Sequence, residues 1–145
     1  MISYRIENIP ISVLLRGIEE NHIFLQDRNM NRSFIHWSDE KKGSYINSIF
    51  AGMPILPIIF DGTTRPWKVI SGKEALTAIL DFYNNKLKIS RSKYIPLVSP
   101  FYYNNIPFFL KRKFVSTRIQ CYVINPPTSV FDVKEIKDFF SSFYD

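Results

Sequence analysis

The stretch WKVISGKEALTAILDFYNN, residues 67–85, decides the fold of this chain. It predicts a short apolar strand over 67–70, a sharp turn at Gly72 and an amphipathic helix that starts at Ser71. The apolar face of that helix is expected to hold Leu76, Ile79, Leu80 and Tyr83. Ser71 and Glu74 have the spacing of a capping box, in which each side chain bonds the backbone N–H of the other residue. Backbone N–H groups converge at strand-to-helix turns, so this turn is also the first place to look for an active site.

Strands and helices alternate on both sides of this stretch. Before it, the pattern predicts a helix over 11–21, a short strand over 22–27, a polar loop over 26–36, a helix capped by Ser38, a buried strand over 54–60 and a hairpin turn over 61–66. The buried stripe of the second helix is expected to hold Ile46, Ile49, Phe50 and Met53, with Gly52 near its end. Later come an irregular segment over 86–104, a helix over 106–114, a strand over 118–124 and a helix near 132–144. This order predicts one α/β domain over residues 1–145, a small mixed sheet with flanking helices.

The composition excludes several classes of protein. Apolar residues make up 46% of the 145 residues, which suits a globular domain with a hydrophobic core. No window approaches ~18 uninterrupted apolar residues, so no membrane span is expected. The first ten residues do not have the pattern of a secretory signal, and a cytoplasmic location is therefore expected.

Few residues suit covalent or metal chemistry. The single cysteine, Cys121, lies in an apolar stretch and is expected to be a buried small residue rather than a nucleophile. With only His22 and His36, and no cysteine cluster, neither a metal site nor a cofactor is expected. His36 is interpreted as an ordinary loop residue rather than a general base, and Asp61 as part of the hairpin turn rather than a catalytic acid. No catalytic residue is assigned.

Positive charge is concentrated in one third of the chain. The formal net charge is +6, and residues 82–131 carry eight basic side chains and no acidic one. The basic residues are Lys86, Lys88, Arg91, Lys93, Lys111, Arg112, Lys113 and Arg118. The aromatic residues among them are Tyr94, Phe101, Tyr102, Tyr103, Phe108 and Phe109. Basic groups neutralise phosphates and exposed rings stack on unpaired bases, so this segment predicts a contact with nucleic acid.

Two alternatives stay open for the same segment. An acidic protein surface would attract these cations as well as a polyanion does. In the other alternative, Phe108 and Phe109 belong to the core and the cations form a solvated rim around it.

The order of several motifs resembles a known family. NRSFIHW (31–37), YINSIFAGMPILPIIF (45–60) and VISGKEALTAILDFYNNKL (69–87) resemble, in that order, the N-terminal domain of GmrSD-type restriction enzymes. YYNNIPFFLKRKF (102–114), RIQCYVI (118–124) and IKDFFSSF (136–143) are similar to its later segments. The resemblance covers nearly the whole chain. It implies the ParB/sulfiredoxin-like fold, which in active relatives hydrolyses nucleotides or cleaves DNA.

The signature of that family is degenerate here. Relatives open the helix with Asp-Gly-Gln-Gln-Arg-Leu-Thr, and the same positions in this chain are Ser71, Gly72, Lys73, Glu74, Ala75, Leu76 and Thr77. A carboxylate at the first position can hold a metal ion or order a water, and an arginine at the fifth can clamp a phosphate. Neither Ser71 nor Ala75 can act in this way.

An arginine and a tryptophan that precede the signature in relatives are matched by Arg32 and Trp37. The resemblance therefore implies a pseudo-enzyme whose turn is kept as a helix start. A residual anion site stays open as an alternative, and its residues would be Arg32, Trp37, Ser71, Gly72, Lys73 and Glu74.

Three functions are consistent with these observations. The first is non-catalytic binding of nucleic acid, which the resemblance connects with restriction and with phage or mobile-element conflict. The second is a protein-interaction module that inhibits or regulates a defence or nuclease complex. The third is a residual nucleotide hydrolase or nuclease that uses Arg32, Lys73 and Glu74. Loss of the signature Asp and Arg favours the first two.

Overall fold

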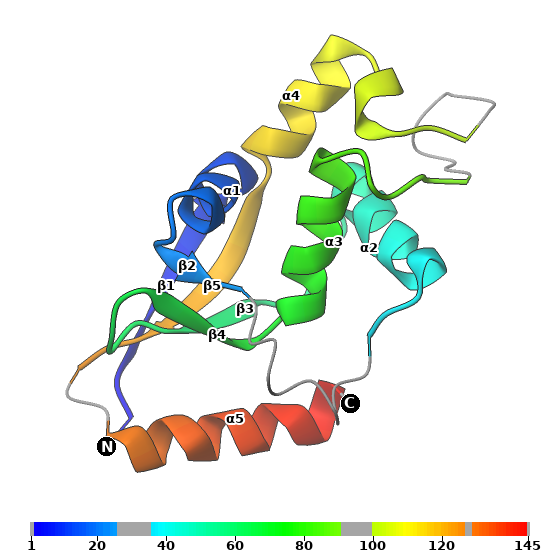
Figure 1. Cartoon of the computed structure of the whole chain (residues 1–145). Helices are drawn as coiled ribbons and strands as arrows, with labels where there is room; N and C mark the ends of the chain where they lie inside the picture. Colours follow the sequence, from blue (N-terminus) through cyan, green and yellow to red (C-terminus); the bar gives the residue numbers. More distant parts are fainter. Residues whose placement is uncertain (1, 26–35, 91–99, 127–128, 145) are drawn as a thin grey trace.

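The computed structural model describes residues 2–25, 36–90, 100–126 and 129–144. Its strands are β1 (Tyr4–Pro10), β2 (Ile23–Phe24), β3 (Ile58–Asp61), β4 (Trp67–Ser71) and β5 (Arg118–Ile124). Its helices are α1 (Ile11–Glu19), α2 (Asp39–Ala51), α3 (Lys73–Tyr83), the 3₁₀ helix η2 (Tyr103–Asn105), α4 (Phe108–Ser116) and α5 (Val130–Tyr144). The predicted α/β domain with a mixed sheet and flanking helices is confirmed (Figure 1).

The sheet has the strand order β1-β5-β3-β4-β2. Strand β5 pairs with β1 in antiparallel and with β3 in parallel orientation. Strands β3 and β4 form an antiparallel hairpin, and the short β2 adds to β4 in parallel orientation. Strand β1 was not predicted from the sequence, although Tyr4, Arg5, Ile6 and Glu7 alternate between apolar and charged as an edge strand does.

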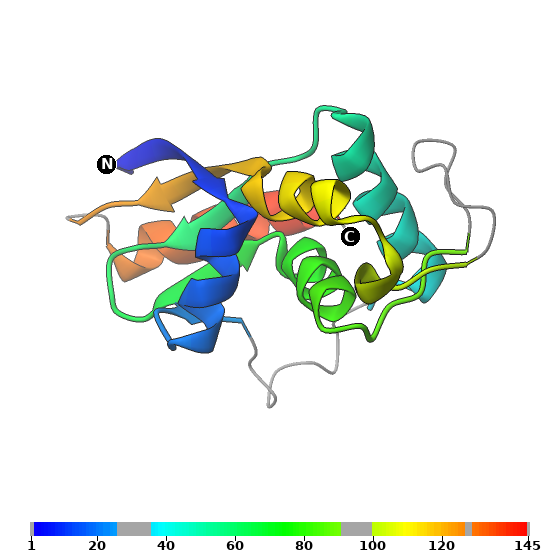
Figure 2. The same cartoon turned by 90° about the horizontal axis from the view of Figure 1, so that it is seen from above.

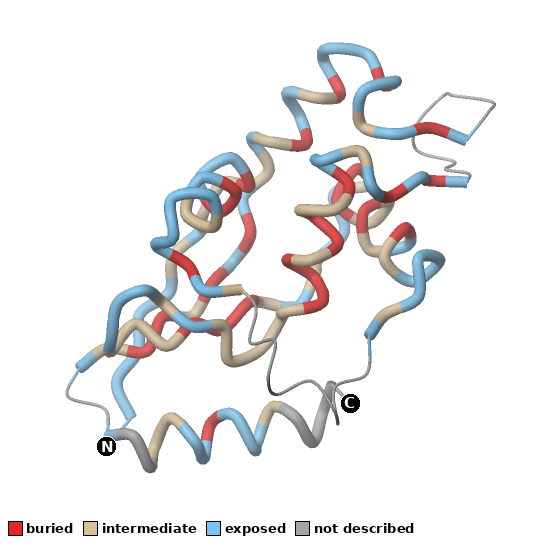
Figure 3. Tube along the Cα trace, viewed as in Figure 1, coloured by how far each residue is buried: buried red, intermediate tan, exposed pale blue. Residues whose placement is uncertain are grey.

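The helices cover the two faces of the sheet unequally. Helices α1, α2, α3 and α4 lie on one face, and α5 runs across the other (Figures 1 and 2). The main core lies on the first face and includes the rings of Phe50, Phe82 and Phe114, whose centroids are 5.2 to 6.1 Å apart. A smaller cluster under α5 holds Ile59 and Ile124. Buried residues accordingly follow α3 and the central strands, while α5 is mostly exposed or intermediate (Figure 3).

Most of the predicted helix signals are confirmed in α2. The Ser38 hydroxyl accepts a hydrogen bond from the Lys41 N–H at 3.2 Å, which satisfies one free donor of the first turn. Gly52 ends the helix with φ of 71°, a left-handed conformation that glycine adopts without strain. The prediction that Met53 is buried is wrong, because this residue lies beyond the helix end and is 49% exposed.

In α3, the predicted apolar face is partly wrong. Leu76 and Ile79 are fully buried, but Tyr83 is exposed and Phe82 is buried in its place. Ala75 and Ala78 also face the core, which shifts the centre of the buried face of this helix. Phe82, three positions after Ile79, lies on the shifted face, whereas Tyr83, four positions after it, lies outside the face. The predicted helix over 11–21 ends at Glu19, two residues early.

Candidate functional site

The strand-to-helix turn is built around Gly72, which is the N-cap of α3 with φ of 98°. The predicted capping box is wrong, because no side chain caps this helix. Ser71 instead belongs to β4, where it pairs with Ile59 of β3, and its extended backbone continues the sheet. A β-carbon at Gly72 would approach Cγ1 of Ile58 to 2.9 Å, so the turn requires both the glycine conformation and the absent side chain.

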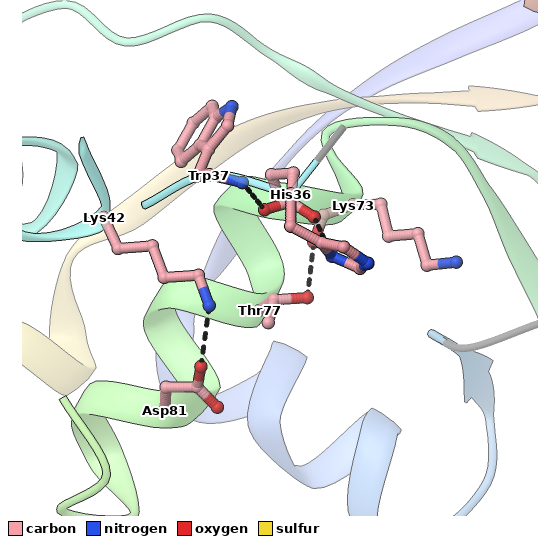
Figure 4. Close-up of polar contacts among 7 residues, drawn as sticks. His36, Trp37, Lys42, Lys73, Thr77 and Asp81 are labelled. Atoms are coloured by element: carbon pink, nitrogen blue, oxygen red, sulfur yellow. Dashed lines mark hydrogen bonds and ion pairs between the residues drawn. The ribbon is translucent and has the colours of Figure 1, made fainter. Parts of the chain in front are cut away.

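The carboxylate of Glu74 makes a long-range contact instead of a cap. This residue lies in the first turn of α3 and is only 8% exposed. One of its oxygens accepts a hydrogen bond from the Trp37 N–H at 2.6 Å, and the other lies 3.4 Å from Nδ1 of His36 (Figure 4). The positive end of the helix dipole also favours a carboxylate here. Glu74 therefore fastens the segment before α2 to the start of α3.

The structure brings only part of the predicted anion site together. The Trp37 backbone contacts Glu74 at the turn that Gly72 forms. The Trp37 ring, however, packs on α2, with its centroid 5.7 Å from that of the Tyr45 ring and 4.8 Å from the Lys41 ammonium. The Lys73 side chain extends away from Trp37 (Figure 4). Arg32 lies outside the described residues. The negatively charged Glu74 lies in the first turn of α3, so anion binding at the turn stays a prediction that this geometry does not favour.

Ala75, which matches the fifth position of the signature in the resembling family, has no space for a larger side chain. Ala75 is 6% exposed and faces the core, so an arginine at this position would have to displace its neighbours. The packing around Ala75 therefore leaves no space for the arginine that the resembling family has at this position.

The Glu74 contact leads to a stability prediction. Replacing Glu74 with alanine is expected to lower the free energy of unfolding by about 2 kcal/mol, because the partly buried Trp37 N–H loses a charged acceptor. Glu74→Gln should lose less, since its amide oxygen still accepts from Trp37. Urea denaturation measures both. The matched control is Glu40→Ala, which removes an exposed acid from the first turn of α2 and should change little. Equal losses for the Glu74→Ala and Glu40→Ala variants would contradict this role.

A second candidate site lies at the opposite end of α3, where three segments meet. Ile89 and Phe101 exchange two backbone hydrogen bonds of 2.8 and 3.0 Å. The Asn104 N–H donates to Oδ1 of Asn85 at 2.9 Å. These contacts join residues 83–90 to residues 101–105, and the Tyr103 hydroxyl donates to the Lys111 carbonyl of α4 at 3.5 Å. We call residues 83–90, residues 101–105 and α4 together the α4 end (Figures 1 and 2).

The α4 end holds five of the eight predicted basic residues, and one of them, Lys113, makes a structural contact that is described below. Lys86, Lys88 and Arg112 are exposed, and Lys111 is half-buried with its ammonium 5.7 Å from the centroid of the Tyr103 ring. Arg91 and Lys93 lie outside the described residues.

The other two basic residues make structural contacts. The Lys113 ammonium donates to the carbonyl of Phe50 at 3.1 Å, near the C-terminus of α2, where a cation is favoured. Arg118 lies on β5 and donates to the carbonyl of Asn8 on β1 at 3.3 Å. We therefore separate Lys113 and Arg118 from the cations that can meet a partner.

Aromatic rings are exposed beside these cations. Phe108 is 72% and Phe109 is 65% exposed, and the Arg112 guanidinium lies 5.9 Å from the centroid of the Phe108 ring. The alternative that both phenylalanines belong to the core is wrong. Leu110 and Phe114, four positions apart, form the buried side of α4, which turns residues 108 and 109 toward solvent. Large exposed rings at a basic surface are typical of a binding site.

The remaining chemistry-bearing residues are structural. Cys121 is fully buried, which confirms the prediction of a buried small residue, and burial raises the pKa of its thiol to about 12. Asp61 accepts hydrogen bonds from the N–H and hydroxyl of Thr63, at 2.9 and 2.5 Å, as a turn residue does. Within the described residues, no group of three or more His, Cys, Asp or Glu side chains is placed to hold a metal ion. Nor does any helix in that part of the chain have the length and apolar character needed to cross a membrane.

One pocket was not predicted from the sequence. It has a volume of about 430 Å³ and lies between β1, α1 and the start of β4, with Arg16, His22, Arg65 and Trp67 among its lining residues. None of the predicted site residues that the structure describes lines it. Its charges are mixed, because Glu7 and Glu20 also line it, and it therefore indicates no ligand class.

No protein-family model, curated protein or solved structure matches this chain.

Proposed function

We propose that the protein is a catalytically degenerate ParB-like domain that binds nucleic acid through the α4 end. The observation that carries this proposal is the exposed pair of Arg112 and Phe108 on α4, 5.9 Å apart, with Phe109 exposed next to it. Lys86 and Lys88 add exposed positive charge on the segment that residues 101–105 join to α4. The resemblance to restriction enzymes suggests a role in restriction or in conflict with phages and mobile elements, in the cytoplasm.

Electrostatics supports a polyanion as the ligand. The described part of residues 82–131 holds no acidic side chain, so the cations at the α4 end have no partner of opposite charge within their own segment. Each phosphate that such a cation neutralises releases a bound counterion, which makes binding favourable at low salt.

The rings favour unpaired bases. A phenylalanine ring that is 65% or more exposed offers its face or edge to the solvent, and stacking on a base removes this apolar surface from water. In duplex nucleic acid the base faces are already stacked, so the rings gain less there. Single-stranded DNA or RNA is therefore the expected form of the ligand.

A triple variant tests the proposal. Lys86→Ala/Lys88→Ala/Arg112→Ala is expected to weaken binding to a short single-stranded DNA about thirtyfold at roughly physiological salt, measured by fluorescence anisotropy. The matched control, Lys68→Ala/Lys134→Ala/Lys137→Ala, removes the same charge from exposed positions on β4 and α5. Equal weakening by the two triple variants, or no binding by the wild type, would refute the proposal. Lys113 is left unchanged because it supports the packing of α2.

A protein partner is the second candidate function, favoured by the apolar pair Phe108 and Phe109 on one helical turn. Such a pair also suits a groove on an acidic protein, including a subunit of a defence or nuclease complex. The two functions differ in their ligand. If the wild type binds no nucleic acid but captures an acidic protein, and Phe108→Ala/Phe109→Ala abolishes the capture, the interaction module is supported.

A further inference from the structure

Within the described residues, strand β1 is an edge of the sheet with a partner strand on one side. It pairs with β5 on one side, and β1 is the first strand in the sheet order. In Figure 2, none of the helices in the described part of the chain lies along the outer side of β1. Tyr4 and Ile6 are 55% and 54% exposed, which leaves apolar side chains on this edge. Exposed edges of this kind are templates for pairing with another strand.

The backbone groups that face outward can be identified. The Ser3 carbonyl accepts from the Asn125 N–H at 2.8 Å, and the Ile11 N–H donates to the Thr117 carbonyl at 2.9 Å. These contacts extend the β1–β5 register beyond both ends of the strand, so the odd-numbered residues of β1 are the hydrogen-bonded ones. Tyr4, Ile6 and Asn8 therefore direct their N–H and C=O groups to the outer edge, where the Asn8 carbonyl also accepts from the Arg118 side chain at 3.3 Å.

We propose that a second copy of this chain pairs with this edge, β1 against β1 in antiparallel orientation with Ile6 opposite Ile6. The outward groups of Tyr4 would then pair with those of Asn8 from the other copy. Pro10 has no N–H to donate, which limits the ladder to the residues before it. The result is one continuous sheet through two copies.

The charges of β1 select this register. With Ile6 on the two-fold axis, Arg5 of each copy lies opposite Glu7 of the other copy. These are non-hydrogen-bonded pairs, in which the two side chains are closest. A shift of the register in either direction that keeps the outward backbone groups paired is less favourable. One shift places Arg5 opposite Arg5, and the other places Glu7 opposite Glu7. Both residues are about half exposed and form an ion pair of 3.3 Å within the chain. In the dimer, the Arg5 and Glu7 side chains of the two copies would therefore form a cluster of two positive and two negative charges. This self-complementarity argues for a second copy rather than an unrelated strand.

Sedimentation equilibrium of the full chain tests the inference. The wild type is expected to be a dimer, and Ile6→Lys is expected to be a monomer, because it places two like charges on the axis. The matched control is Phe24→Lys on β2, at the other edge of the sheet and also about half exposed, which should remain a dimer. A monomeric wild type, or an Ile6→Lys variant that remains a dimer, would overturn the proposal.

Charge reversal tests the register itself. Arg5→Glu alone and Glu7→Arg alone should each weaken the dimer about tenfold, because like charges then face each other twice. An equimolar mixture should regain the wild-type affinity, since the acidic strand of one variant faces the basic strand of the other. Failure of the mixture to form a heterodimer from two folded variants would refute this register. Arg5 also donates a hydrogen bond to Asn125 and lies over the Trp67 ring, so circular dichroism is used to check that each charge variant folds. If a charge variant does not fold, the Ile6→Lys variant tests the dimer.

Discussion

Replacing Gly72 with alanine is expected to lower the free energy of unfolding by about 3 kcal/mol. Two costs combine. The φ of 98° is unfavourable for any residue with a β-carbon, and that β-carbon would lie 2.9 Å from Cγ1 and 3.3 Å from Cα of Ile58. Ile58 is fully buried in β3, so it cannot move aside without disturbing the core. Urea denaturation measures the loss.

Gly52 provides the control for this prediction. It also has a positive φ, of 71°, but a β-carbon there would meet no atom within 4 Å. Gly52→Ala should therefore show only the conformational cost, about 1 kcal/mol. The difference between the two variants isolates the close approach of the turn to β3. Equal losses would mean that Ile58 does not constrain the turn.

Truncating both exposed rings is expected to weaken binding of single-stranded DNA about a hundredfold, since each stacking ring contributes roughly 1–3 kcal/mol. The variant is Phe108→Ala/Phe109→Ala. Because these side chains are 72% and 65% exposed, their removal should leave the free energy of unfolding almost unchanged. Fluorescence anisotropy measures the affinity, and denaturation confirms the fold.

Phe139→Ala is the matched control for the rings. Phe139 is 56% exposed on α5, which lies on the other face of the sheet. It should bind DNA as the wild type does. A double Phe108 and Phe109 variant with full affinity would contradict the role of stacking, and would leave phosphate contacts as the only support for binding.

Local sequence signals predicted the elements of the fold well. The strand over 118–124 is β5 as expected, Ser38 and Gly52 bound α2, and the buried strand before the hairpin is β3. These successes rest on caps, turns and periodicity, which act within a few residues. Strand β1 was missed because a mostly exposed edge strand buries too little apolar surface to give a strong pattern.

The candidate sites depended on contacts that no local pattern contains. Glu74 and Trp37 are 37 positions apart, so the sequence suggested a capping box where the structure has a long-range hydrogen bond. Lys113 looked like its basic neighbours, but only the packing of α4 against α2 shows that its ammonium meets the Phe50 carbonyl. The exposure of Phe108 and Phe109 likewise depends on which side of α4 meets the core.

The most direct test of nucleic-acid binding at the α4 end is the salt dependence of the affinity for single-stranded DNA. Log affinity against log salt concentration is measured for the wild type and for Lys86→Ala/Lys88→Ala/Arg112→Ala. If these three cations contact phosphates, the slope should become shallower by about 2, since each contact on a single strand contributes roughly 0.7. An unchanged slope in a folded variant would show that phosphates are not bound there and would contradict the account.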